Sequence, residues 1–292
     1  MPYEALLQAL GANETAANAS RHLHHAVADE LAARHTTQSP VILGLAGSQG
    51  SGKSTHSKLL QALCSEKYGL SCCVLSIDDV YLSRAEGHSL STDIHPLLAT
   101  RGVPGTHNIA LAHATFDALS TADRTTSAII PRFDKASDDP VPKVNWPRVL
   151  GPVDVIIFEG WCVGAQPQAE RDLEEPVNQL ESSEDPDGLW RTYVNTALES
   201  DYAGLFQRMD MLLMLAAPNF EVVFNWRKKQ EDMLRAKTQG SDHPGIMNDA
   251  ALRRFIMHYQ RITEAMLDEM PTRADCVVRL SPEQEPLSVS WK

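Results

Sequence analysis

The residues from Gly47 to Ser54 have the types and the order that a phosphate-binding loop requires. The loop matches the pattern G-x-x-x-x-G-K-[ST] in full, and Thr55 extends it; its residues are Gly47, Ser48, Gln49, Gly50, Ser51, Gly52, Lys53 and Ser54. Glycines let main-chain N–H groups surround an anion without a Cβ in the way. Lys53 offers a mobile ammonium to the β- and γ-phosphates, and the Ser54 hydroxyl can bind Mg²⁺. The pattern therefore predicts that residues 47–55 bind the phosphates of a nucleotide.

Two apolar runs in the sequence end directly in acidic residues. The run 74–77 leads into Asp78 and Asp79, and the run 155–158 leads into Glu159. In a parallel sheet the carboxyl ends of the strands meet at one edge, where ligands bind. An acid there can hold Mg²⁺ or accept the proton of an attacking hydroxyl. We expect all three acids to lie beside the phosphate loop, with Ser54, Asp79 and Glu159 at the metal, and the sequence leaves open whether Asp78 or Glu159 is the base.

A group of cationic side chains lies in loops that follow predicted elements. Its members are Arg101, His107, Arg132 and Lys135. A carboxylate or phosphate is recognised by paired positive donors, for which the planar fork of arginine is well suited. Each of these side chains taken alone is more often a surface residue than a ligand. Taken together at loop positions, they are expected to bind an anionic acceptor.

These side chains need a scaffold, and the hydrophobic pattern predicts one. Short apolar runs alternate with helical patterns, which is typical of a parallel sheet with crossover helices. The expected strands are 41–46, 72–77, 127–131, 153–158, 211–215 and 276–280, and the expected helices are 53–66, 109–119, 189–208, 219–237 and 249–270. We predict an α/β fold of three layers, with a helical extension at 1–40 and one domain at 41–292. Two proline-rich stretches, 134–152 and 166–187, are expected to be irregular insertions in that domain.

Length and charge exclude several classes of protein. The chain has 292 residues, with 26 Lys+Arg against 38 Asp+Glu and a formal net charge of −12, which argues against a nucleic-acid partner. Much of the acidic excess lies in 166–201, which holds ten acids and two arginines. No apolar run reaches the length of a membrane span, and the N-terminus lacks the pattern of a secretory signal. With five cysteines in no metal-binding spacing, we expect a cytoplasmic protein with reduced thiols and no membrane partner.

A phosphate loop alone does not name an activity, because GTPases and transport ATPases use one too. The chain lacks both the Asn-Lys-x-Asp motif that reads guanine and the Leu-Ser-Gly-Gly-Gln signature of transport ATPases. The leading hypothesis is an ATP-dependent kinase for a small molecule, with Mg²⁺ as cofactor. The alternative from another class is a non-catalytic, ATP-binding regulatory protein. The residues do not determine the oligomeric state.

Five ordered motifs resemble those of the D-glycerate 3-kinases of the plant and fungal type, a branch of the phosphoribulokinase, uridine kinase and pantothenate kinase superfamily. They span about residues 41–280: Ser76-Ile77-Asp78-Asp79-Val80-Tyr81, Arg101-Gly102-Val103-Pro104-Gly105-Thr106-His107, Pro131-Arg132-Phe133-Asp134-Lys135, Phe158-Glu159-Gly160-Trp161, and Asn225-Trp226-Arg227 followed by Gln230-Glu231. The resemblance implies a P-loop kinase fold and transfer of the γ-phosphoryl group of ATP to a hydroxyl of D-glycerate. It implies that Asp78 is the general base, that Glu159 helps to hold Mg²⁺, and that Arg227 belongs to a lid over the transferred phosphate. Tyr81, in the first of these motifs, is counted with the acceptor site.

The sequence departs from that pattern at two places on the acceptor side. Asp138-Asp139-Pro140-Val141-Pro142 stands where the family continues with Gly-x-Gly-Asp-Arg, and Asn108 stands where Asp is usual. Both departures bear on the acceptor more than on kinase activity. A kinase for another small, anionic, hydroxylated metabolite is therefore kept as an alternative.

Overall fold

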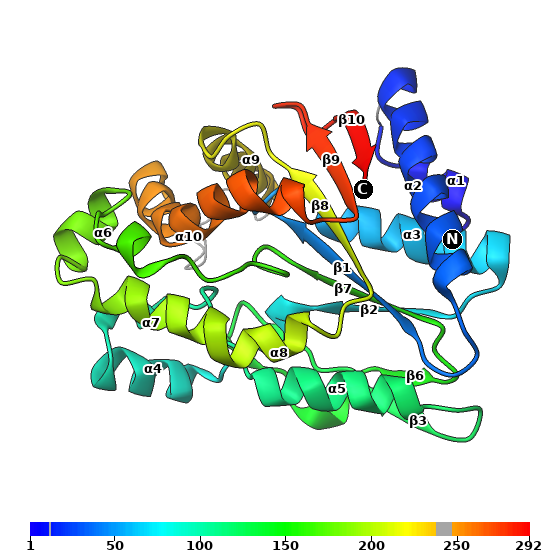
Figure 1. The fold of residues 1–292 in the computed structure, drawn as a ribbon, viewed down its shortest axis with the longest axis horizontal. Helices are drawn as coiled ribbons and strands as arrows, with labels where there is room; N and C mark the ends of the chain where they lie inside the picture. The colour runs from blue at the N-terminus through cyan, green and yellow to red at the C-terminus, as the bar shows by residue number, and fades with distance from the viewer. Residues whose placement is uncertain (12, 238–246) are drawn as a thin grey trace.

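The computed structural model describes residues 1–11, 13–237 and 247–292, and its centre is a mostly parallel sheet (Figure 1). Its strands are β1 (Val41–Gly47), β2 (Cys72–Ser76), β7 (Val155–Gly160), β8 (Met211–Ala216), β9 (Cys276–Leu280) and β10 (Pro286–Trp291). Their order is β10-β9-β8-β1-β7-β2. Neighbours run parallel, except that β10 is antiparallel to β9. The predicted α/β fold is confirmed.

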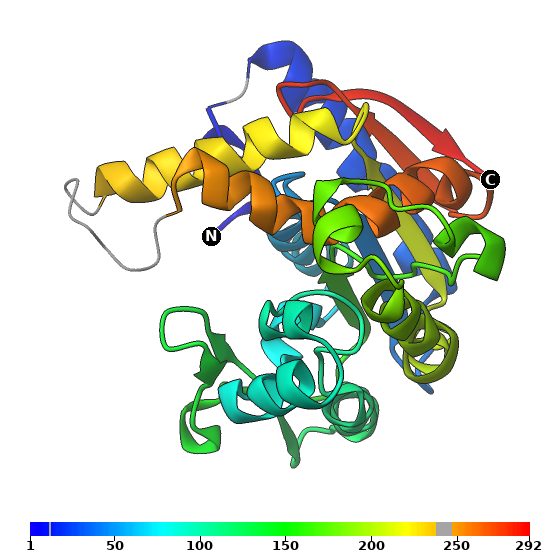
Figure 2. The same cartoon turned by 90° about the vertical axis from the view of Figure 1, so that its left-hand side faces the viewer.

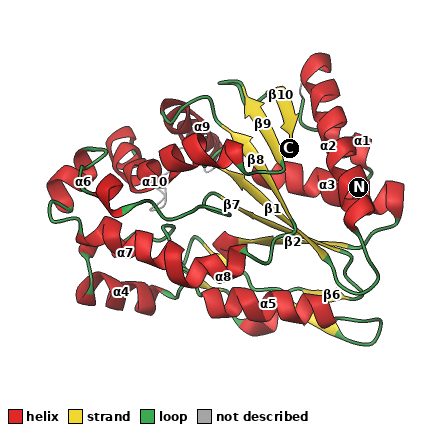
Figure 3. Cartoon of the chain, in the orientation of Figure 1, coloured by secondary structure: helices red, strands yellow, loops and turns green. Residues whose placement is uncertain are grey.

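Helices form a layer on each face of the sheet (Figure 3). The helices are α1 (Tyr3–Gln8), α2 (Glu14–Arg34), α3 (Lys53–Tyr68), α4 (Arg84–Asp93), α5 (Ile109–Thr121), α6 (Gln179–Glu184), α7 (Leu189–Ala197), α8 (Ala203–Phe206), α9 (Glu221–Lys237) and α10 (Asp249–Glu269). A π turn, Leu198–Tyr202, joins α7 to α8, so the helix predicted at 189–208 is continuous but locally widened. Within the described part of the chain, no helix has the length and apolarity to cross a membrane.

Alternate residues of the central strands enter two separate hydrophobic cores. In β7, Ile156 and Phe158 pack with residues of α5, α7, α8 and α10, whereas Val155 and Ile157 pack with residues of α1, α2, α3 and α9. Side chains of a strand alternate between its faces, so burial of both faces requires the continuous apolar runs seen in the sequence. The two cores fix the sheet, and with it the edge where the strands end.

One expected strand, 127–131, does not join this sheet. Its residues form the short β3 (Ser127–Ile129), which pairs antiparallel with β6 (Arg148–Leu150) away from the central sheet. Only Ala128 of β3 is fully buried, and Pro131 has no N–H to donate to a ladder. The apolar run is therefore too short to be covered on both faces. A small hairpin of β4 (Phe133–Asp134) and β5 (Asp139–Pro140) opens the region that was expected to be irregular at 134–152.

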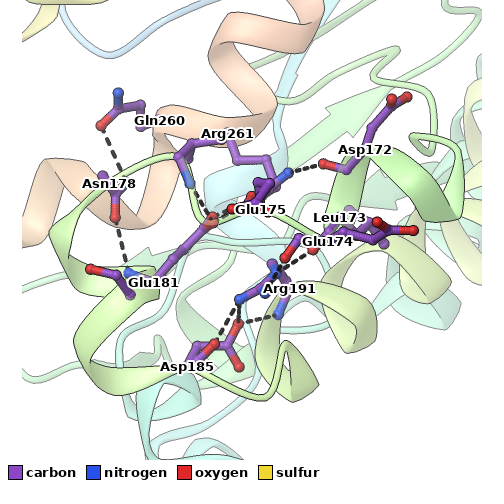
Figure 4. A network of polar contacts seen from close by, with 12 residues as sticks. Asp172, Leu173, Glu174, Glu175, Asn178, Glu181, Asp185, Arg191, Gln260 and Arg261 are labelled. Atoms are coloured by element: carbon purple, nitrogen blue, oxygen red, sulfur yellow. Dashed lines mark hydrogen bonds and ion pairs between the residues drawn. The ribbon is translucent and has the colours of Figure 1, made fainter.

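The acidic stretch 166–201 contains two buried ion pairs, one within the stretch and one to α10 (Figure 4). Glu181, on α6, is fully buried and pairs with Arg261 of α10 at 2.6 Å. Asp185 is also buried and pairs with Arg191 of α7 at 3.0 Å. Both guanidinium groups also donate to backbone carbonyls of the same stretch. The composition of this stretch favoured an irregular loop. Some of its acids are instead buried and paired with arginines, and these pairs fix α6 to the domain.

The N-terminal helices contact the phosphate-loop helix through a buried chain of polar side chains. The Tyr3 hydroxyl lies 2.9 Å from His24 Nδ1, and His24 Nε2 lies 2.8 Å from His56 Nδ1 on α3. Burial lowers the pKa of His56 from 6.5 to about 4. Burial, followed by the neighbouring His56, also lowers the pKa of His24 well below its ordinary value. Both rings are therefore neutral near pH 7.

We expect the buried His56 ring to make the fold less stable in mild acid. The unfolded chain protonates this ring as pH falls below 6.5, whereas the folded chain resists protonation down to about 4, so stability is lost between these values. The shift corresponds to about 2 kcal/mol between roughly pH 7.5 and pH 5. Urea unfolding of the parent and of His56→Gln at both pH values measures it. The variant should lose about 2 kcal/mol less than the parent, and equal losses would disprove the assignment.

Candidate active site

The phosphate loop turns from β1 into α3 at the carboxyl edge of the sheet. Gly50 and Gly52 have φ angles of +82° and +91°, which favour glycine. A Cβ on Gly50 would lie 2.6 Å from the Cβ of Trp226 on α9, so no larger residue fits without a shift. Because α3 begins at Lys53, its free N–H groups and the positive end of its dipole face the loop. The predicted loop therefore has the backbone that an anion site needs.

The Lys53 ammonium lies against the loop that it follows. Its Nζ donates to the carbonyls of Gly47 at 2.7 Å and Ser48 at 3.0 Å. Burial lowers the pKa of Lys53, while the carboxylates of Glu159 and Asp78 act in the opposite direction. The side chain is thus held at the loop, within electrostatic reach of two acids predicted for the reaction centre.

Ser54 and Glu159 form the pair of oxygen donors next to the loop. The Ser54 hydroxyl donates to Glu159 Oε1 at 2.8 Å, and Glu159 is buried at the end of β7. No group of three or more His, Cys, Asp or Glu side chains among the described residues is arranged to hold a metal ion. Kinase Mg²⁺ is commonly held by one or two carboxylates together with substrate phosphates and water. A serine hydroxyl beside one carboxylate is therefore a donor set that fits magnesium.

Asp78 lies on a single helical turn after β2, residues Ile77–Val80, and both of its oxygens have partners. The Tyr81 hydroxyl donates to Oδ1 at 2.5 Å, and Lys135 Nζ donates to Oδ2 at 2.6 Å. Burial would raise the pKa of Asp78, but the Lys135 ammonium and the Tyr81 hydroxyl outweigh it and lower the pKa to about 2. Asp78 is therefore a carboxylate at any physiological pH.

These groups line one cavity of about 320 Å³. Of the residues singled out from the sequence, the cavity is lined by Gln49, Gly50, Lys53, Ser54, Asp78, Tyr81, Arg101, Lys135, Glu159 and Arg227. The charged lining comprises four cationic side chains and two carboxylates, which leaves a local net charge of +2 on a chain of −12. The cavity is therefore suited to anions, as a phosphate and an acidic acceptor require.

Arg227 approaches the cavity from α9, which lies beside α10 (Figure 2). Its guanidinium pairs with Glu231, one turn further along α9, at 2.5 Å, and the Glu231 side chain is only 2% exposed. The buried carboxylate thus fixes the direction of the arginine. Its place is compatible with the lid role implied by the family resemblance.

Asp79 and Arg132 lie apart from the main cavity. They pair with each other at 2.9 Å and line a second cavity of about 350 Å³, which shares Ser54 and Glu159 with the first. Burial raises the pKa of Asp79, and the Arg132 guanidinium opposes this shift. The structure therefore brings Ser54 and Glu159 together but directs Asp79 toward Arg132.

His107 packs against the ring of Tyr81. The two rings are stacked with centroids 4.6 Å apart, and His107 Nδ1 lies 2.5 Å from the hydroxyl of Tyr202 in the π turn. The same Tyr202 hydroxyl accepts the Gly105 N–H at 3.0 Å, so it links the His107 ring to the backbone of residue 105. Burial lowers the pKa of His107 to about 4, against the attraction of Asp78, so the ring is neutral and adds no charge to the cavity.

Five residues that line the cavity were not predicted as site residues from the sequence: Gly160, Trp161, Gln230, Phe255 and Tyr259. The Tyr259 hydroxyl donates to the Arg101 carbonyl at 2.9 Å, and Trp161 Nε1 donates to the Gly102 carbonyl at 2.7 Å. These bonds fix the backbone that carries Arg101. Trp161 and Gln230 lie within or beside the quoted motifs, whereas the two α10 aromatics have the spacing of ordinary core residues.

The chain is similar to known kinases in sequence and in fold. No protein-family model matches the chain. It is 32% identical over 228 residues to kinase mug58 of Schizosaccharomyces pombe, covering 75% of this chain and 78% of that one. It is 28% identical over 244 residues to the chloroplastic D-glycerate 3-kinase of Arabidopsis thaliana, covering 81% of this chain and half of that one.

Comparison with solved structures shows similarity of fold. A D-glycerate 3-kinase from Cryptococcus neoformans var. grubii superimposes with a TM-score of 0.76 at 24% identity, covering 94% of this chain and 99% of that one. Such identity speaks for the fold alone, whereas the match to mug58 is close and long enough to show kinship. The chain therefore belongs to the family of ATP-dependent P-loop kinases that contains mug58, and it is related to the chloroplastic D-glycerate 3-kinase.

Proposed function

We propose that this kinase transfers the γ-phosphoryl group of ATP to a hydroxyl of a small anionic metabolite, with D-glycerate as the leading acceptor. The observation that carries the proposal is a single cavity in which the phosphate loop faces the Asp78 carboxylate and two further cations, Arg101 and Lys135. The D-glycerate 3-kinase relatives support this choice of acceptor.

On the nucleotide side, the loop amides and Lys53 bind the phosphates, and Arg227 offsets charge on the transferred group. The hydroxyl of Ser54 and the carboxylate of Glu159 would hold Mg²⁺. When bound, that ion neutralises charge on the phosphate oxygens. These roles use preorganised charge, which is the main contribution of a protein to phosphoryl transfer.

On the acceptor side, Asp78 orients the attacking hydroxyl. The hydroxyl oxygen forms a bond to the γ-phosphorus, the bond from that phosphorus to the β–γ bridging oxygen breaks, and the hydroxyl proton passes to Asp78. A carboxylate with a pKa of about 2 is a weak base, so proton transfer comes late and positioning contributes more than base strength. The partners of the carboxylate, Tyr81 and Lys135, keep it ionised and directed into the cavity.

A panel of acceptors tests the proposal. ADP release is measured with ATP and Mg²⁺ in the presence of D-glycerate, other hydroxy acids, nucleosides, pantothenate or sugars, and ATP binding is measured in the same sample. We expect a hydroxy acid to raise ADP release at least about tenfold above background. A preferred neutral acceptor would contradict the anionic assignment. ATP binding without acceptor-dependent release from any compound would favour the regulatory alternative.

A further inference from the structure

The hairpin of β4 and β5 forms two ion pairs with residues that line the cavity, and it supplies the cation of one pair and the anion of the other. Its Lys135 contacts Asp78, the proposed base, and its Asp138 contacts Arg101, a proposed acceptor cation. The hairpin thus holds one catalytic and one binding side chain at once. Asp138 belongs to the segment in which this chain departs from the family pattern.

The local backbone directs Asp138 toward Arg101, from the side of a neighbouring cavity that both residues line. Asp134 Oδ1 accepts the Ala136 N–H at 3.0 Å, and Asp134 Oδ2 accepts the Ser137 hydroxyl at 2.7 Å, which together close the turn. Asp138 follows with a φ of +57°, in the left-handed region that Asp and Asn tolerate best after glycine. The next acid, Asp139, turns the other way and accepts the backbone N–H of Arg84 at 3.1 Å.

Arg101 has only part of its surface left for an anion. Its guanidinium lies over the rings of Tyr81 and Phe133, 5.8 Å and 5.4 Å from their centroids. The edge of the guanidinium therefore remains for hydrogen bonds, and one of its terminal nitrogens already donates to Asp138. A carboxylate binds arginine best through two parallel bonds along such an edge. An acidic acceptor and Asp138 therefore compete for the same donors.

We propose that Asp138 determines acceptor specificity by occupying Arg101 until the carboxylate of a small hydroxy acid displaces it. The inference rests on the proposed function and narrows its substrate class to acids. The Arg101 and Asp138 side chains are 33% and 44% exposed, so their ion pair is weak and a bound acid can replace it. A neutral acceptor has no group to release Arg101 and gains nothing from it.

The test replaces Asp138 with asparagine, which keeps the shape and tolerates the same φ. From the strength of exposed ion pairs, Asp138→Asn should lower the KM for D-glycerate about two- to fivefold, with the KM for ATP and kcat unchanged. Asp139→Asn is the matched control, because it removes the same charge from the same hairpin without touching Arg101. It should leave the KM for D-glycerate unchanged.

A double variant separates competition from general charge. In an Arg101→Gln background, D-glycerate should bind more weakly, and Asp138→Asn should add no further change. Calorimetric titration of D-glycerate into the protein with a non-hydrolysable ATP analogue gives the same comparison without turnover. A Kd or KM that Asp138→Asn raises or leaves unchanged, or D-glycerate binding to neither protein, overturns the inference. Absence of turnover with every acceptor refutes the proposed function instead. In that case the calorimetric titration still tests whether Asp138 competes with D-glycerate for Arg101.

Discussion

Lys53→Ala is expected to lower kcat/KM for ATP by about 10²–10³-fold, in line with the loss of one preorganised donor from a charged transition state. The Lys53 ammonium is held by two loop carbonyls and is within electrostatic reach of Glu159 and Asp78. Its removal leaves the developing charge on the phosphate oxygens without its nearest mobile cation. Both ATP affinity and turnover should fall, because the side chain contacts the phosphates before and during transfer.

Lys58→Ala is the matched control for this loss. Lys58 lies on the same helix, is exposed, and does not line the main cavity. The variant removes the same charge and should keep near-parental activity. Unchanged kinetics in Lys53→Ala would reject the phosphate-loop assignment, and an equal loss in both variants would point to general electrostatics instead.

Asp78→Asn is expected to lower kcat by about 10²–10⁴-fold, the range typical of a positioned general base. The Kd for ATP should stay within about twofold of the parental value, because Asp78 faces the acceptor side and not the loop carbonyls. Asparagine keeps one acceptor oxygen for the Tyr81 hydroxyl but offers no site for the proton. Rapid-quench measurement of a single turnover separates this chemical step from product release.

The same variant separates Asp78 from Glu159. Since Glu159 accepts from Ser54 beside the loop, Glu159→Gln should raise the Mg²⁺ concentration needed for half-maximal rate, whereas Asp78→Asn should leave it unchanged. With a pKa of about 2 for Asp78, the parental pH profile should show no acid limb from this group above about pH 4. A magnesium shift in Asp78→Asn with normal turnover would exchange the two roles.

The scaffold was predictable wherever the sequence pattern and burial agree. Continuous apolar runs predicted strands covered on both faces; β1, β7 and β8 are buried throughout, whereas β2 and β9 form at the expected positions but are only partly covered. The prediction of a central strand at 127–131 was wrong because apolar composition alone does not show whether both faces of a strand can be covered. The helix α6 was hidden because its acids, typical of a solvated loop, pair with arginines distant in the sequence; Glu181 contacts a residue 80 positions away.

The candidate site was also predictable only in part. The loop residues and the acids at strand ends could be predicted, since a local pattern and the geometry of a parallel sheet place them. The direction of a side chain could not, because it depends on partners elsewhere in the chain: Asp79 turns to Arg132, and Asp138 turns to Arg101. Tyr259 could not be predicted either, because it has the helical spacing of a core residue and yet lines the cavity.

Phosphorus NMR of a reaction mixture with ATP, Mg²⁺ and D-glycerate tests the central claim most directly. The cavity predicts that a phosphomonoester signal of the acid grows in step with ADP in the parent and is lost in Asp78→Asn. ADP accompanied only by free phosphate, with no phosphorylated acid from D-glycerate or from any other hydroxy acid offered, would contradict the account.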